Sequence, residues 1–374
     1  MSGITITELA ERCGVAVSTV SRAMNDRSGI SARTRERILQ VARETGYVPN
    51  TAAKNLKISS TGTVAVVFQG WTSELLNHVL DTVRDQLTEA GLDLYSVHVS
   101  DHDANTATIV RLVTERRLAG LVFLGRFGDK TLPDDPALRD YLAGVGIPVV
   151  FCTTRGLTDD ADAYPSISVD DRAGAAELTR HLLSLGHRRI AFGPATAGFP
   201  LESDHVWALR YRGYRDALSH AGIVPEDGWL IPSTDPDDIY TMANGYHSVS
   251  EWLVDGAAPR GVTAIVTSCD AAGLGAMRAA RDAGLRVPDD ISVTGFDGLD
   301  FARYSTPSLT TVVQPTAEIA RETSRYLVRA ITENARDFVP PSIRGSLLVG
   351  ESTATIPAPP GADGEDAELP RGLR

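Results

Sequence analysis

Residues 5–25 read TITELAERCGVAVSTVSRAMN, and this stretch decides the architecture of the N-terminal part of the chain. Thr5, followed three residues later by Glu8, is a capping box that opens a first helix. Gly14 then supplies a turn, and the pattern predicts a second helix over residues 17–24. A helix, a glycine turn and a second helix together predict a helix-turn-helix.

A third helix follows the second. Ser31 is suited to cap its start, and Pro49 ends the helical region because the residue before a proline is pushed out of the α conformation. The predicted inner face of this helix consists of Ile38, Leu39, Val41 and Ala42. With a first helix over residues 6–12, the sequence therefore predicts a small all-α unit.

The second helix presents side chains suited to DNA. Arg22 matches guanine O6 and N7 with both arms of its fork, Val17 can contact a thymine methyl, and Ser18 lies beside it at the helix start. Short donors suited to phosphates are Thr5, Thr19, Ser21, Asn25, Ser31 and Thr34. Such residues are also ordinary helix caps, so on topology alone a protein-binding three-helix bundle remains an alternative to DNA binding.

Charge is distributed unevenly along the chain. Residues 1–60 hold nine Lys or Arg and five Asp or Glu, a net charge of +4, whereas the remainder holds 27 and 43, a net charge of −16. The total of −12 argues against a protein coated for nucleic acid. The asymmetry nevertheless fits a basic reading module joined to an acidic body.

Composition indicates a folded protein of the cytoplasm. The chain has 374 residues, 43% of them apolar, which is enough for domains with substantial cores. Cys13, Cys152 and Cys269 are odd in number and far apart, so they predict neither disulfides nor a zinc site. The N-terminus lacks the apolar stretch of a signal peptide, and apolar runs such as residues 64–68 are too short to span a membrane.

From Thr63 the pattern changes to short apolar strands separated by amphipathic helices. Helices are predicted near residues 73–90, 105–117 and 136–144. Strands are predicted at residues 64–68, 92–99, 121–124, 149–152, 167–169, 190–192, 229–231, 264–267 and 291–294. This alternation predicts an α/β core of two lobes, each a parallel sheet covered on both faces. Ligands of such folds bind beyond the carboxyl ends of the strands, so the loops facing the cleft between the lobes are the candidate site.

Enzymes also use open α/β sheets, but the sequence holds no P-loop, no G-x-S-x-G and no G-x-G-x-x-G after a strand. Its eight histidines show no metal-binding spacing; His98 and His102 are four apart, yet the residues between them predict a loop. We expect no catalysis, no cofactor and no metal. A solute-binding protein that feeds a transporter remains an alternative for the core alone.

Four N-terminal segments match a known signature in order and spacing. They are Thr5–Ala10 (TITELA), Gly14–Asn25 (GVAVSTVSRAMN), Ser31–Arg35 (SARTR) and Gly46–Asn50 (GYVPN). Together they resemble the LacI/GalR family of bacterial regulators. The resemblance implies that Val17, Ser18 and Arg22 read bases. It also implies DNA contacts from Tyr47, Asn50, Ala53, Lys54 and Leu56.

The resemblance further implies that residues 52–56 form a hinge helix that folds only on DNA, pairs with its dimer mate and inserts Leu56 into the minor groove. This agrees with a helix too short to be stable alone and with a leucine wedge that kinks DNA. Ala16 departs from the family, which usually has a capping Ser or Thr there, and we expect a loss of roughly 1 kcal/mol of cap stability.

The resemblance continues through the core to about residue 355. Its segments are Leu185–Phe192, Arg210–Leu218, Gly273–Met277, Ile291–Asp297 and Leu309–Val312. These are similar to blocks of the family's periplasmic-binding-protein-like domain. The family topology implies that the chain crosses between the lobes three times.

Effector contacts carry over from the family position by position. Arg210 matches an arginine that grips sugar hydroxyls or an effector carboxylate, and the alternative is a surface arginine. Asp297 matches a carboxylate that accepts from two sugar hydroxyls, and the alternative is an Asx-turn or a cap. Tyr240 matches an aromatic that stacks on a ring face, with ordinary packing as an equal alternative.

Several matched positions depart from the sugar-binding pattern. Cys269 stands where an Asn often contacts effector, Thr153 where an Asp is common, and Gln69–Trp71 where Pro-Asp often begins a cleft loop. These changes suggest an effector with fewer or differently placed hydroxyls, with Gln69 and Trp71 as further contacts. Asp270 either caps the next helix or touches the ligand.

The predicted organisation is a helix-turn-helix domain at 1–49, a hinge helix and linker at 50–62, an effector-binding and dimerisation core at 63–356, and a disordered tail at 357–374. The resemblance implies a homodimeric, allosteric repressor that binds palindromic operator DNA and a sugar. The sequence leaves open whether effector releases or promotes DNA binding, and whether the protein is a dimer or a tetramer.

Overall fold

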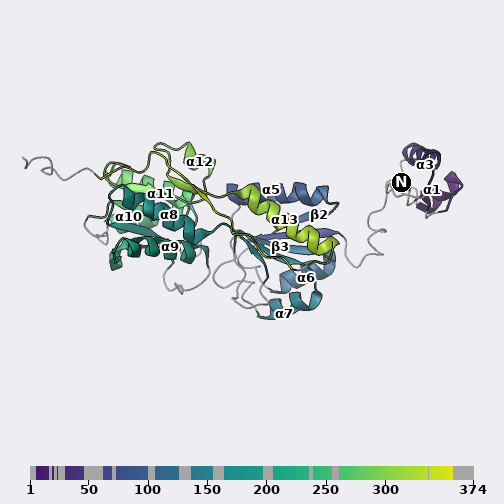
Figure 1. The fold of residues 1–374 in the computed structure, drawn as a ribbon, viewed down its shortest axis with the longest axis horizontal. Helices are drawn as coiled ribbons and strands as arrows, with labels where there is room; N and C mark the ends of the chain where they lie inside the picture. Colours follow the sequence, from purple (N-terminus) through teal and green to yellow (C-terminus); the bar gives the residue numbers. More distant parts are fainter. Residues whose placement is uncertain are drawn as a thin grey trace, which may run out of the picture. The chain divides into compact units, whose positions relative to one another are not determined.

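The computed structural model describes the chain at residues 6–16, 19–20, 23, 30–45, 62–69, 73–99, 106–125, 136–154, 164–196, 205–235, 239–254, 261–335 and 337–356. The chain divides into two units, Met1–Gly62 and Thr63–Arg374 (Figure 1). None of the helices within the described ranges offers the uninterrupted apolar length that a bilayer crossing requires.

The N-terminal unit is helical, as predicted. It contains α1 (Ile6–Cys13) and α3 (Ala32–Glu44), and Thr19, Val20 and Ala23 are helical between them. Gly14 has a φ of +61°, which gives the turn after α1 its left-handed conformation. One apolar cluster fills the unit, made of Leu9, Ala10, Cys13, Val20, Ala23, Ile38 and Ala42. Of the predicted inner positions of the third helix, Ile38 and Ala42 are confirmed as buried and Val41 packs partly buried against the cluster, whereas Leu39 is half-buried and lies outside it.

The first lobe of the larger unit is built on a parallel sheet of five strands in the order β2-β1-β3-β4-β5. The strands are β1 (Thr63–Gln69), β2 (Asp93–Val99), β3 (Gly120–Leu124), β4 (Val149–Cys152) and β5 (Ser166–Ile167). One face is covered by α5 (Glu74–Glu89) and α13 (Thr316–Thr332), and the other by α6 (Thr106–Arg116) and α7 (Pro136–Val145) (Figure 1).

The second lobe repeats this plan with a parallel sheet in the order β7-β6-β8-β9. The strands are β6 (Ile190–Ala195), β7 (Leu230–Pro232), β8 (Ala264–Thr267) and β9 (Ser292–Thr294). One face is covered by α8 (Asp171–Ser184) and α9 (Val206–His220), and the other by α10 (Met242–Val254) and α11 (Asp270–Asp282). A short helix, α12 (Asp300–Arg303), follows β9.

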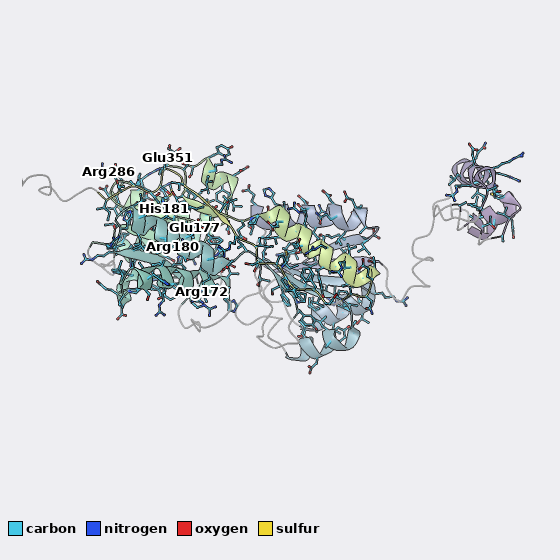
Figure 2. The ribbon with its side chains drawn as sticks, viewed as in Figure 1. Arg172, Glu177, Arg180, His181, Arg286 and Glu351 are labelled. Atoms are coloured by element: carbon cyan, nitrogen blue, oxygen red, sulfur yellow. The ribbon has the colours of Figure 1, made fainter. Side chains whose placement is uncertain are left out.

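The segment before residue 356 is bound to the second lobe. The amide of Val293 donates to the carbonyl of Ser352 at 2.9 Å. His181 of α8, labelled in Figure 2, lies with Nε2 3.0 Å from the Thr353 hydroxyl. Burial lowers the pKa of this imidazole from its usual range, so the contact is made by neutral histidine at neutral pH.

The chain passes between the lobes three times, as the family resemblance implied. It leaves the first lobe between β5 and α8, returns between β10 (Thr311–Val313) and α13, and leaves again between α13 and β11 (Ser346–Leu348). Strands β10 and β11, on either side of α13 in the chain, pair antiparallel. Helix α13, which follows the second lobe in the sequence, thus packs on the first lobe.

Two predicted strands are shifted relative to those of the structure. The strand predicted at residues 167–169 ends at Ile167, because Val169 has already left the sheet and bridges only Ile343. The strand predicted at 229–231 begins one residue later, because Trp229 closes the 3₁₀ turn η2 (Asp227–Trp229). Both errors occur where a strand meets a change of direction.

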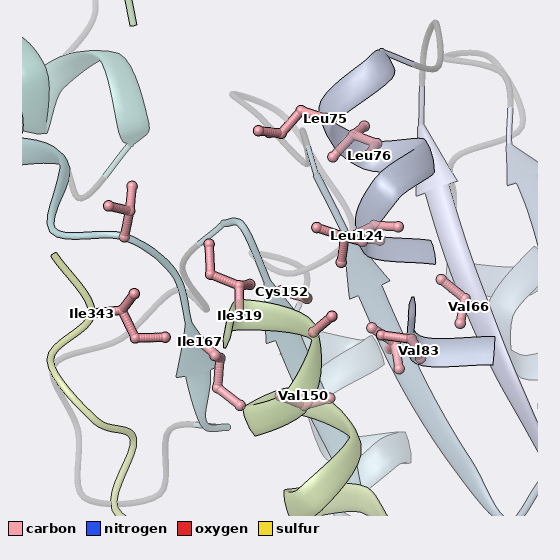
Figure 3. Packing of buried hydrophobic residues seen from close by; sticks show 14 of the residues in the cluster. Val66, Leu75, Leu76, Val83, Leu124, Val150, Cys152, Ile167, Ile319 and Ile343 are labelled. Carbon is pink, nitrogen blue, oxygen red and sulfur yellow. The ribbon is translucent and has the colours of Figure 1, made fainter. Parts of the chain in front are cut away.

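Burial on both faces explains why the strands are nearly continuous apolar runs. Successive residues of a strand point to opposite faces. In β1, Val64 and Val66 therefore join the cluster under α5 and α13, whereas Ala65 and Val67 join the one under α6 and α7. Figure 3 shows the first cluster, including Ile319 from α13.

Glycine permits close packing of α8 against α9. A Cβ at Gly213 of α9 would collide with the carbonyl oxygen of Arg172 in α8. We predict that Gly213→Ala lowers the free energy of unfolding by about 1–3 kcal/mol, measured by urea denaturation, because the helices must separate. The matched control is Gly144→Ala in α7, where a Cβ meets nothing within 4 Å, and helix propensity predicts a gain of up to about 1 kcal/mol. Equal stability of the two variants would contradict this account.

Candidate functional site

Arg210 of α9 lies inside the second lobe, so the surface alternative for this residue is wrong. Its side chain is only 5% exposed, and Nε donates to Asp171 Oδ1 at 2.8 Å. One terminal nitrogen donates to the Ser268 carbonyl, and the other lies 3.6 Å from Asp297 Oδ1. The guanidinium carbon lies 3.7 Å from the centre of the Phe296 ring, a cation–π contact.

The partners of Arg210 come from one edge of the second sheet. Ser268 directly follows β8, Asp297 follows β9, and Asp171 opens α8. The preceding Asp170 caps α8, since its carboxylate accepts from the amide of Ala173 at 2.9 Å. The edge is formed by the carboxyl ends of the strands, where the fold class predicts ligand binding.

The backbone of Asp297 is held in a conformation that L-residues rarely adopt, with a φ of +128°. Its amide donates to the Val312 carbonyl at 2.9 Å, and its carbonyl accepts from the Gln314 amide at 3.0 Å. The Gln314 side-chain amide also donates to Asp297 Oδ1 at 2.7 Å. Such strain persists only where surrounding structure imposes it, and it is concentrated at functional positions.

Cys269, and not Asp270, caps the helix that follows β8. Cys269 is the N-cap residue of α11, and its sulfur accepts from the amide of Ala272 at 3.3 Å. Burial raises the pKa of this thiol to about 12, so it stays protonated. Of the two roles left open for Asp270, capping is wrong, because its carboxylate accepts from the amide of Leu299 at 2.7 Å and the hydroxyl of Thr311 at 2.5 Å.

The carboxyl of Asp297 titrates near neutrality. Burial raises its pKa to about 7; nearby Asp270 and Asp171 act in the same direction, against the opposing effects of the Arg210 guanidinium and the Gln314 amide. Burial also raises the pKa of Asp270, although hydrogen bonds from Thr311 and Leu299 oppose the shift. The cluster therefore holds more acidic groups than its single arginine neutralises among the described residues.

The other expected effector residues are distributed over both lobes. Tyr240 is half-buried, packs against the α8–α9 cluster and interacts electrostatically with Arg210. Thr153 follows β4 in the first lobe, with a φ of +59° and a buried hydroxyl that has no hydrogen-bond partner in the described part of the chain. Gln69 ends β1, and Trp71 lies outside the described residues. The structure thus brings together Arg210, Asp297, Cys269 and Tyr240.

Sequence reasoning missed Asp171, Gln314 and Thr196. Thr196 directly follows β6, and its buried hydroxyl also has no partner among the described residues. A signal existed for Asp171, since it follows the capping Asp170 at the start of a helix beside the strand ends. Gln314 offered none, because only the tertiary fold brings β10 beside the loop after β9.

Three of the expected DNA-binding residues lie within the described part of the N-terminal unit. Thr19 is helical and half-buried. The Ser31 hydroxyl accepts from the Thr34 amide at 3.1 Å and lies 2.7 Å from the Thr34 hydroxyl, so Ser31 caps α3 as predicted. The other residues expected to bind DNA lie outside the described ranges. They are Thr5, Val17, Ser18, Ser21, Arg22, Asn25, Tyr47, Asn50, Ala53, Lys54 and Leu56.

Ala16 stands at the start of the second helix. Its carbonyl accepts from the amides of Thr19 and Val20 at 2.9 and 3.2 Å, which is the backbone pattern of an N-cap residue. An alanine has no side-chain acceptor to add to this pattern.

Within the described ranges, the His, Cys, Asp and Glu side chains form no group of three or more that would hold a metal ion.

Family models match both units. Residues 5–50 match the model of bacterial regulatory proteins of the lacI family, and residues 179–353 match a periplasmic binding protein-like domain. The HTH-type transcriptional regulator CelR of Thermobifida fusca is 32% identical over 361 residues, covering 93% of this chain and 98% of that protein. The HTH-type transcriptional regulator MalR of Clostridium butyricum is 29% identical over 337 residues, covering 89% and 94%.

Solved structures agree with these relatives. The lac repressor dimer bound to operator and the anti-inducer ONPF has a TM-score of 0.76 at 25% identity, covering 94% of this chain and all of that one. A complex of the transcriptional regulator CelR with cellobiose has a TM-score of 0.67 at 28% identity, covering 93% and 99%.

A helical N-terminal unit followed by a two-lobed core with parallel sheets is the architecture of a ligand-responsive transcriptional regulator. The chain belongs to the LacI family of bacterial regulatory proteins. The fold class predicted from the sequence is thereby confirmed, and the chain is a DNA-binding transcriptional regulator.

The raised pKa of Asp297 predicts that the contribution of this carboxyl to stability decreases as pH rises. The unfolded carboxyl ionises near pH 4 and the folded one near 7, so the folded state binds the extra proton between these values. We predict that the free energy of unfolding of the wild type, relative to Asp297→Asn, falls as pH rises from 5 to 7 and then levels off. The limiting slope is about 1.4 kcal/mol per pH unit. Urea denaturation at several pH values measures it, and a difference that rises with pH would contradict the assignment.

Proposed function

We propose that this chain is a cytoplasmic, homodimeric repressor whose affinity for a palindromic operator is set by a sugar bound at the Arg210–Asp297 cluster. The observation that carries the proposal is the presence, in one chain, of a lacI-family N-terminus and a buried polar cluster at the carboxyl ends of the second sheet. The relatives are transcriptional regulators, which supports a protein that binds its ligand without transforming it.

In this proposal the recognition helix reads bases through Val17, Ser18 and Arg22, and residues 50–62 form the hinge and linker. Phosphate contacts from short hydroxyl donors such as Thr19 position the helix. The related lac repressor was solved as a dimer on operator, which supports the dimer and its two half-sites here.

The effector acts through the loops that join the lobes. Arg210 and Asp297 bind sugar hydroxyls, with Tyr240 beside them and Thr153 opposite, in the first lobe. The solved complex of CelR with cellobiose supports a sugar as the ligand class. Asp297 is hydrogen-bonded to Gln314, the residue that follows β10 on the passage to α13, so ligand at Asp297 biases the segment between the lobes.

We predict that Arg22→Ala weakens operator binding by about 1–3 kcal/mol and flattens base preference at one position in each half-site, because a bidentate guanine contact is lost. Selection from a randomised duplex pool measures the preference. The charge-matched control is Arg12→Ala in α1, an exposed residue whose loss weakens binding without changing base preference. Unchanged preference in Arg22→Ala would refute its reading role.

We predict that Asp297→Asn keeps operator affinity but abolishes the response to effector. Asparagine retains an acceptor for Gln314 and tolerates positive φ, while the charge that binds hydroxyls is lost. Operator binding with and without cellobiose, and then other sugars, measures the response. The control is Asp300→Ala, an exposed carboxylate three residues away that should respond like the wild type. A wild-type response in Asp297→Asn sinks the proposed site.

A further inference from the structure

The charge around Arg210 is already balanced before any ligand arrives. Asp171 lies 2.8 Å from its Nε and Asp297 lies 3.6 Å from a terminal nitrogen. Asp270 adds a third acidic group that interacts electrostatically with both Arg210 and Asp297. Among the described residues in this cluster, one guanidinium faces three carboxyl groups. A ligand therefore meets no unpaired positive charge there.

Few hydrogen-bond donors of Arg210 remain for a ligand. A guanidinium has five N–H groups in a fixed plane. Asp171 and the Ser268 carbonyl take two of them, and the Phe296 ring covers one face of the plane. Of the three that remain, the two on the second terminal nitrogen lie nearest Asp297, since that nitrogen is 3.6 Å from Oδ1 of Asp297, whose side chain is 14% exposed. A ligand atom that binds this nitrogen is therefore also close to the Asp297 carboxyl group.

A donor of Arg210 beside the Asp297 carboxyl group favours ligands that carry hydroxyl groups. A hydroxyl group accepts from Arg210 and donates to Asp297 at the same time, so it satisfies both neighbours. A carboxylate or a phosphate only accepts, and its charge is repelled by Asp171 behind the arginine and by Asp297 when that carboxyl is ionised. Placing a like charge against the unwanted ligand is a standard source of specificity.

We propose that the buried Asp171–Arg210 pair makes the effector site selective for uncharged, polyhydroxylated ligands over sugar acids and sugar phosphates. Asp171 is the specificity-determining residue, because it turns a cation that would attract anions into a neutral hydrogen-bond donor. The inference rests on the proposed effector site and narrows its ligand class.

The experiment compares uncharged sugars with their anionic counterparts on the full-length protein. The probes are cellobiose, maltose, glucose and galactose, each beside the corresponding aldonate, and glucose beside glucose 6-phosphate. Isothermal titration calorimetry gives each dissociation constant. We expect at least one uncharged probe to bind and its anionic counterpart to bind at least about tenfold more weakly.

The variant Asp171→Asn tests the cause of this preference. It leaves the Arg210 charge without its nearest partner. We therefore expect the dissociation constant of the acid, divided by that of the uncharged ligand, to fall at least about tenfold, because the acid binds more tightly. The matched control is Asp216→Asn. Asp216 of α9 pairs at 2.6 Å with Arg172 of α8, the residue labelled in Figure 2, but both side chains are exposed, at 37% and 53%. The control should keep the wild-type ratio.

The outcomes separate this inference from the proposed function. Anionic probes that bind the wild type as tightly as their uncharged counterparts overturn the inference, while the effector site stands. A folded Asp171→Asn protein with an unchanged ratio overturns the role of Asp171. If that variant does not fold, the wild-type ratio alone decides. Binding that is unaffected by Asp297→Asn instead overturns the proposed site.

Discussion

The Arg210 guanidinium is buried, and a buried cation is stable only when counter-charges and hydrogen-bond acceptors surround it. Its partners come from the start of α8, the end of β8 and the end of β9. These segments are far apart in the sequence, so the arginine requires that two strand ends and two helices, α8 and its own α9, meet at one point. Removing one partner would leave a charge unpaired in the interior, at a cost of about 3–5 kcal/mol. The arrangement of the candidate site follows from this requirement.

The same cluster reaches the passages between the lobes. Asp297 pairs through its backbone with the β10 segment and through its side chain with Gln314. Asp270 holds Thr311 of β10 and the amide of Leu299. The residues that would sense a ligand are thus also the residues that fix the connecting strand. Ligand recognition and the position of that strand share one set of hydrogen bonds.

Periodicity and local chemistry predicted much of the fold. Helix α1 and the strands of the first lobe match their predicted ranges to within a residue or two, because both depend on local apolar patterns. Arg210 and Asp297 emerged from the family resemblance, and the structure brings them together. The burial of Arg210 and the part played by Gln314 were not predictable locally, and the local signal for Asp171, its place after the capping Asp170, did not identify Arg210 as its partner. Each depends on contacts between segments whose proximity only tertiary packing decides.

Helix α13 covers the first-lobe sheet, yet its residues follow the whole second lobe in the chain. A ribosome delivers the strands of that sheet long before Thr316. The part of the apolar face that α13 covers, with residues such as Val150 and Ile167, therefore lacks its cover throughout synthesis of the second lobe. Folding of the first lobe is completed only when the C-terminal part of the chain has been made, which lengthens the time during which apolar surface is exposed to aggregation.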